Sequence, residues 1–110
     1  IIAYAPCINH GSKNGMGKSI LTEKQAVEAG YWNIFRYDPR LEAEGKNPLT
    51  IDSKEPSASY YDFIMNEVRY SSLMRSFPDR AKALFEQAEK YAKLKYQKLL
   101  AQKEMLEPKN

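Results

Sequence analysis

Residues 77–105 read FPDRAKALFEQAEKYAKLKYQKLLAQKEM, and this stretch predicts one long helix. Pro78 favours the first turn of a helix, where the missing N–H of proline would have no partner. Apolar residues then recur three and four positions apart, as on one face of a helix: Ala81, Leu84, Phe85, Ala88, Ala92, Tyr96 and Leu99. At 1.5 Å per residue, a helix over residues 79–105 is about 40 Å long. Because the apolar stripe is narrow, we expect this helix to lie along a surface.

The residues just before this helix also predict helical structure. Ser59 and Asp62 have the spacing of an N-terminal cap and its first turn. A helical stripe follows, made of Tyr60, Phe63, Ile64 and Val68. We therefore expect one or two helices over residues 59–76, and we assign residues 59–110 to a mainly helical C-terminal extension.

A segment rich in turn-forming residues precedes the extension, residues 46–58 with the sequence KNPLTIDSKEPSA. Its two prolines and its Asp, Ser and Asn residues are typical of a linker, with a short extended piece at residues 49–51. The composition changes across this segment. We predict a boundary here, between an α/β unit over residues 1–45 and the helical extension.

The first 37 residues predict a strand, a loop, a helix and a second strand. Residues 1–5 are a continuous apolar run that ends at Pro6, as in the buried strands of parallel sheets. Residues 31–37, YWNIFRY, are rich in aromatic side chains and predict the second strand. The expected fold class is therefore α/β, a fragment of an open parallel sheet followed by the helical extension. The absence of an initiator Met and the strand-like opening predict a fragment of a larger protein.

Between the two predicted strands lie a polar, Gly-rich loop at residues 8–18 and a helix at residues 19–29. Thr22 and Gln25 have the spacing of a capping box, which satisfies N–H groups at a helix start. Gly30 suits the position just after the last turn of the helix.

Composition excludes several classes of protein. The chain has 110 residues, 43% of them hydrophobic and 28% charged, which fits one small domain at most. No stretch approaches the roughly 18 apolar residues that a membrane span needs. The single cysteine rules out an internal disulfide and suits a reducing compartment, so we expect a cytoplasmic protein with no membrane contact. A net charge of +3 is too small to indicate a nucleic-acid partner.

The loop region YAPCINHGSKNGMGKS, residues 4–19, holds the only cysteine and the only histidine of the chain. Its Gly-Lys-Ser ending is similar to that of a phosphate-binding P-loop. That motif also needs a glycine where Ser12 stands, and the nearest one, Gly11, is one place too early. A nucleotide site is therefore disfavoured, although N–H groups at a helix start remain able to hold an anion.

Cys7 and His10 leave three readings open. A nucleophilic cysteine needs a base close to its sulfur, and a spacing of three residues on a loop does not guarantee that. Metal and iron–sulfur sites take about four ligands, and this chain supplies one thiolate. An inert thiol in a structural loop is the third reading.

Three segments resemble one enzyme family. They are YAPCINHG at 4–11, GYWNIFRYDPRLEAEGKNPLTIDSKEP at 30–56 and EVRYSSLMRSFPDRAKALFEQAE at 67–89. In this order and spacing, the chain resembles the C-terminal end of pyruvate:ferredoxin (flavodoxin) oxidoreductase over about residues 1–100. The resemblance implies a large enzyme with thiamine diphosphate and several [4Fe–4S] clusters. It implies cleavage of pyruvate with coenzyme A to acetyl-CoA and CO2, with electrons passed to ferredoxin or flavodoxin.

The resemblance also implies roles for the residues of the loop. Cys7 matches the fourth cysteine ligand of the cluster nearest the thiamine cofactor, in the domain to which residues 1–45 would belong. The N–H groups of Ile8, Asn9 and Gly11 would then face cluster sulfides, and His10 would lie beside them.

The family's other cofactor-binding residues are missing from these 110 residues. Neither the thiamine motif, Gly-Asp-Gly followed by Asn, nor the other cluster cysteines are present. We therefore expect the chain alone to bind neither cofactor and to catalyse nothing. Its expected partners are the rest of the enzyme and a second subunit of a homodimer. Arg69 is the expected ion-pair partner in that contact, although a plain structural role for it is favoured over a functional one.

A second hypothesis is a free-standing, basic helical module. The long helix carries several lysines together with Tyr91 and Tyr96, and such a surface can contact RNA or another protein. RNA binding that weakens with added salt would favour this hypothesis over the enzyme segment.

Overall fold

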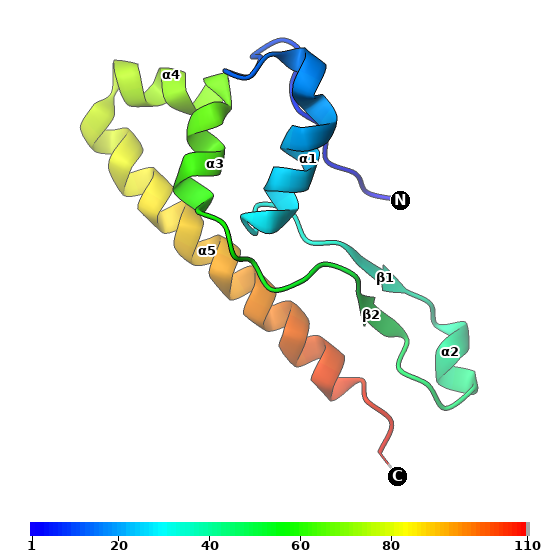
Figure 1. Cartoon of the computed structure of the whole chain (residues 1–110). Coiled ribbons are helices and arrows are strands. Elements are labelled where there is room, and N and C mark those ends of the chain that lie inside the picture. The colour runs from blue at the N-terminus through cyan, green and yellow to red at the C-terminus, as the bar shows by residue number, and fades with distance from the viewer. Residues whose placement is uncertain (110) are drawn as a thin grey trace.

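The computed structural model describes residues 1–109. One long helix, α5, lies along one edge of the molecule, and α1, α3 and the two strands lie on one side of it (Figure 1). In chain order the elements are the 3₁₀ turn η1 Met16–Lys18, α1 Ser19–Glu28, β1 Phe35–Tyr37, α2 Arg40–Ala43, β2 Leu49–Ile51, α3 Tyr60–Asn66, α4 Val68–Ser76 and α5 Pro78–Met105.

Helix α5 begins at Pro78 and confirms the predicted long helix. Asp79 in its first turn and Lys103 in its last turn place charges that complement the helix dipole. Its three buried residues all belong to the predicted apolar stripe: Ala81, Phe85 and Leu99. Leu84, also in the stripe, remains 46% exposed, as suits a helix on a surface.

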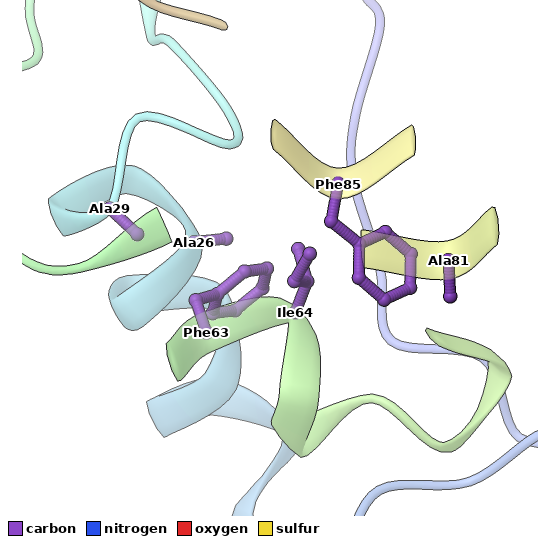
Figure 2. Packing of buried hydrophobic residues seen from close by; sticks show 6 residues of the cluster. All are labelled: Ala26, Ala29, Phe63, Ile64, Ala81 and Phe85. Atoms are coloured by element: carbon purple, nitrogen blue, oxygen red, sulfur yellow. The ribbon is translucent and has the colours of Figure 1, made fainter. Parts of the chain in front are cut away.

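The hydrophobic core lies where α1, α3 and α5 meet (Figure 2). The buried side chains come in three pairs: Ala26 of α1 with Ala29 at its C-cap, Phe63 and Ile64 of α3, and Ala81 and Phe85 of α5. Partly buried aromatic side chains pack around them: Tyr4, Tyr31, Trp32, Tyr60 and Tyr70. Residues on both sides of the 46–58 segment therefore share one core, and the domain boundary expected there stays a prediction.

Two helices, α3 and α4, occupy the region where one or two were expected. Ser59 is the N-cap of α3, as predicted, since its Oγ accepts a hydrogen bond of 3.2 Å from the N–H of Asp62. Glu67 separates the two helices because its backbone is extended, with φ −82° and ψ 121°. This break turns the chain, so α4 leaves in a different direction from α3 (Figure 1).

The sheet is a two-stranded antiparallel ribbon. Strand β1 pairs with β2 in the register Phe35 with Ile51 and Tyr37 with Leu49. The observed strand β1 thus begins four residues after the start of the strand predicted over residues 31–37. Tyr31 and Trp32 instead donate their N–H groups to the carbonyl of Ala26 and close the end of α1. Their rings are consequently placed in the core, and not on a strand.

The strand predicted at residues 1–5 is wrong for this structure. These residues have no regular secondary structure, and Ile1 and Ile2 are exposed. A strand needs a hydrogen-bonded neighbour, and no other segment of residues 1–109 pairs with this one. The α/β class with a helical extension is confirmed, but parallel pairing is not, because the described sheet is antiparallel.

The capping box predicted for α1 is also wrong. Thr22 lies inside the helix, almost fully buried, and its Oγ1 donates to the carbonyl of Lys18 at 3.1 Å. Lys18 itself is the N-cap and makes no side-chain cap bond. Within residues 1–109, no helix is both long and apolar enough to cross a bilayer.

Candidate functional site

Cys7 lies at the start of a tight surface turn formed by residues 8–10. The N–H of Gly11 donates to the carbonyl oxygen of Cys7 at 2.8 Å and closes the turn. Gly11 has a φ of +78°, a left-handed conformation that glycine adopts without steric cost. The backbone that carries the Cys7 side chain is therefore held by a hydrogen bond within the turn.

The groups around the Cys7 sulfur favour a thiolate. Hydrogen bonding from the backbone N–H of His10 lowers the pKa of the Cys7 thiol most, followed by the His10 side chain and the N–H of Asn9. The Nδ1 atom of His10 lies 3.1 Å from Sγ. A thiolate is the form of cysteine that binds metals and attacks electrophiles, so the turn prepares Cys7 for either role.

The Cys7–His10 pair has the short distance that a nucleophilic pair needs. Within residues 1–109, however, the imidazole makes no second hydrogen bond that would orient it as a base. Two grooves run along α5, with volumes of about 490 and 480 Å³, and no residue of the turn lines either groove.

The donor set at the turn fits one corner of an iron–sulfur cluster. Among residues 1–109, no three His, Cys, Asp or Glu side chains gather to hold a metal ion, so further ligands would have to come from other segments. Cluster thiolates accept backbone N–H bonds that tune their potential, and the backbone groups of His10 and Asn9 lower the pKa of the Cys7 thiol here. The N–H of Gly11, expected to face a cluster, instead donates to the Cys7 carbonyl.

The Gly-Lys-Ser ending of the loop does not form a phosphate cradle. The N–H of Gly15 donates to the Ser12 carbonyl at 3.0 Å, and the N–H of Lys18 to the Gly15 carbonyl at 3.3 Å. The Ser19 hydroxyl donates to the Met16 carbonyl at 2.5 Å. The groups that a P-loop turns toward phosphate are thus used inside the loop itself.

Sequence reasoning missed Glu67, the residue between α3 and α4. Its carboxylate is buried and accepts hydrogen bonds from the Tyr4 hydroxyl and, at 3.1 Å, from Nε of Arg69. Arg69, named as an ion-pair partner for other segments but favoured for a structural role, forms its ion pair here and also donates to the Tyr31 hydroxyl. The only sequence signal for this cluster was the close spacing of Glu67 and Arg69. The Tyr4 contact could not be seen in the sequence because Tyr4 lies 63 residues from Glu67.

Comparison with known proteins identifies what the chain is similar to. No family model matches it. The pyruvate:ferredoxin oxidoreductase of Moorella thermoacetica is 54% identical over 102 residues, which span 90% of this chain and 8% of that protein. This chain corresponds to one segment of the pyruvate:ferredoxin (flavodoxin) oxidoreductases. The pyruvate-flavodoxin oxidoreductase of Klebsiella pneumoniae is 52% identical over 96 residues, 87% of this chain and 8% of its own length.

A third relative of the segment carries a different name. The mitochondrial pyruvate dehydrogenase [NADP(+)] of Euglena gracilis is 39% identical over 84 residues, 76% of this chain and 5% of that protein. The chain thus spans less than a tenth of the length of these oxidoreductase relatives. The similarity confirms the family resemblance and favours the enzyme segment over the free-standing helical module.

Proposed function

We propose that this chain supplies Cys7 as one ligand of a [4Fe–4S] cluster in a pyruvate:ferredoxin or pyruvate:flavodoxin oxidoreductase. The whole enzyme would convert pyruvate and coenzyme A to acetyl-CoA and CO2, with thiamine diphosphate bound by other segments. A cluster near the thiamine cofactor supplies a one-electron acceptor. The observation that carries the proposal is the thiolate-favouring turn at Cys7, in a chain similar to such enzymes over most of its length.

Each residue of the turn has a part in this proposal. Cys7 provides the thiolate, and the N–H groups of Asn9 and His10 stabilise its negative charge. Gly11 closes the turn, since its N–H and its left-handed backbone hold the Cys7 carbonyl. Ile8 is 84% exposed and offers an apolar side chain that packing of other segments would use to keep water from the sulfur.

The names of the relatives favour a role for this segment in a step that precedes electron transfer to the final acceptor. Those names mention ferredoxin, flavodoxin and NADP+, yet all three proteins share the segment. A step common to all of them, such as holding a cluster close to the thiamine cofactor, accounts for that sharing. We therefore assign the choice of acceptor to other parts of the enzyme.

The surface of the chain supports its place inside a larger assembly, which we propose is a cytoplasmic homodimer. Large apolar side chains are exposed at both ends and on several elements, including Ile1, Ile2, Ile20, Phe77 and Met105. Scattered apolar residues are normal on surfaces, but this many on a small chain favour burial against other segments. The rest of the enzyme or the second subunit would cover them.

The direct test replaces Cys7 with Ala in the complete oxidoreductase. We expect the loss of about four iron atoms per subunit and the loss of ferredoxin or flavodoxin reduction, because the cluster lacks one thiolate. Asn14→Ala, in the same loop, is the matched control and should keep full iron content. Full iron content in the Cys7→Ala enzyme would contradict the proposal.

A further inference from the structure

The chain on the C-terminal side of the Cys7 turn is bound to the junction between α3 and α4. Ser12 forms an isolated antiparallel bridge with Glu67. The N–H of Lys13 donates to the carbonyl of Asn66 at 2.9 Å, and the N–H of Val68 donates to the carbonyl of Gly11 at 3.2 Å. Backbone bonds from the junction therefore hold the residues that leave the turn.

The chain on the N-terminal side of the turn is held by the same junction through a side chain. Tyr4 lies three residues before Cys7 and donates its hydroxyl to the Glu67 carboxylate. Glu67 is only 3% exposed, so this hydrogen bond is shielded from water. Burial and the Glu67 carboxylate raise the pKa of Tyr4, which keeps its hydroxyl protonated as a donor.

The Glu67 carboxylate is itself fixed to the core. Arg69 bonds its second oxygen, lies 4.7 Å over the Tyr70 ring, and donates to the Tyr31 hydroxyl. The hydroxyls of Tyr31 and Tyr70 are 2.8 Å apart. The carboxylate thus has donors on both oxygens and a rigid aromatic surrounding.

We propose that Glu67 is a positioning residue for the Cys7 sulfur: its side chain holds the chain before the turn, and the backbone groups of its neighbours Asn66 and Val68 hold the chain after it. This inference rests on the proposed function, in which Cys7 binds a cluster. It assigns the helical extension a task at the cofactor, since the α3–α4 junction sets where the thiolate sits. Packing alone does not explain a buried carboxylate at this point, because an apolar residue would fill the space at less cost.

The first experiment measures hydrogen–deuterium exchange in the 110-residue chain itself and needs no cluster. Tyr4→Phe removes one hydroxyl and keeps the ring in the aromatic core, and Glu67→Gln keeps the side-chain volume. We expect amides of residues 7–13 to exchange about tenfold faster in both variants, since a hydrogen bond to a charged group is lost or weakened. Glu89→Gln, which breaks only the exposed ion pair with Lys93, should leave that segment unchanged. Exchange in residues 7–13 equal to wild type in the Tyr4→Phe chain would overturn the clamp.

The second experiment places Tyr4→Phe and Glu67→Gln in the complete oxidoreductase. We expect iron content to stay full, while the electron paramagnetic resonance spectrum of one reduced cluster changes, because its thiolate is held less firmly. A merely structural role would alter stability and leave that spectrum unchanged. Loss of iron in Cys7→Ala with an unaltered spectrum in both variants overturns the positioning role alone. Full iron in Cys7→Ala overturns the proposed function instead.

Discussion

The Sγ atom of Cys7 lies 3.1 Å from Nδ1 of His10, in a turn closed by the Gly11 N–H. The sequence spacing left open whether these two side chains would meet, and the structure brings them together. Because the chain has one cysteine and one histidine, each can be altered without ambiguity about which residue responds.

Replacing His10 with Ala should slow alkylation of Cys7 in the cluster-free chain. The turn lowers the thiol pKa, so thiolate forms at a lower pH than in an ordinary cysteine. The substitution removes the side-chain contribution but keeps the larger one from the backbone N–H. The midpoint of the alkylation rate against pH should therefore rise part of the way toward the value in urea-unfolded chain. Identical midpoints in wild type and His10→Ala would contradict this prediction.

Ile64→Ala should lower the free energy of unfolding by about 2–5 kcal/mol. Ile64 is 1% exposed at the meeting point of α1, α3 and α5, so the missing atoms leave a cavity in the core. Urea denaturation followed by circular dichroism measures the change. Ile20→Ala is the matched control, since Ile20 is 84% exposed, and should change stability by no more than about 0.5 kcal/mol.

Substitution by alanine should lower the free energy of unfolding by different amounts at two glycines whose φ angles are nearly equal. Gly30 has φ +75° and Gly45 has φ +72°, so both substitutions force a left-handed alanine at about 1–2 kcal/mol. At Gly30 a new Cβ would also lie 2.9 Å from Cγ of Pro56, whereas at Gly45 it meets nothing within 4 Å. Gly30→Ala should therefore cost at least about 1 kcal/mol more in urea denaturation. Equal costs would show that Pro56 moves freely aside.

Alkaline pH should destabilise the fold through two partly buried tyrosines, Tyr4 and Tyr31. Burial, followed by the hydrogen bond to Glu67 at Tyr4 and to Tyr70 at Tyr31, raises the pKa of both tyrosines above the ordinary value. Because the folded chain prefers the neutral form, this contribution is complete below about pH 10 and is lost as the pH rises toward the folded values. Phenolate absorbance at 295 nm should thus show some of the eight tyrosines titrating late, one fewer in Tyr4→Phe. Eight ordinary titrations in the folded chain would contradict the buried network.

The helical half of the fold could be predicted from the sequence because its signals are local. The Pro78 start and the three-and-four spacing defined α5, and the Ser59–Asp62 spacing defined the cap of α3. The strand at residues 1–5 failed because pairing depends on a distant partner, which an apolar run does not reveal. The strand predicted over residues 31–37 was wrong at Tyr31 and Trp32 for another reason. The N–H groups of these two residues close α1, and their rings fill the core.

In the candidate site, too, the local feature could be predicted from the sequence and the long-range contact could not. Cys7 was identified through the resemblance of the turn around it, and its local hydrogen bonds agree with a short-range motif. Glu67 and Tyr4 were not identified, because their contact joins residues 63 positions apart and follows no periodic pattern. The break between α3 and α4 that exposes the Glu67 backbone to the loop is likewise a property of the folded chain.

The central claim is that Cys7 ligates a cluster directly, and Cys7→Ser in the complete oxidoreductase tests it most directly. Serine can offer an oxygen where the sulfur was, so a ligated cluster changes its electronic structure and is not merely lost. Electron paramagnetic resonance of the reduced enzyme should show one cluster signal altered, with the other signals intact. A spectrum and an iron content identical to wild type would contradict the claim.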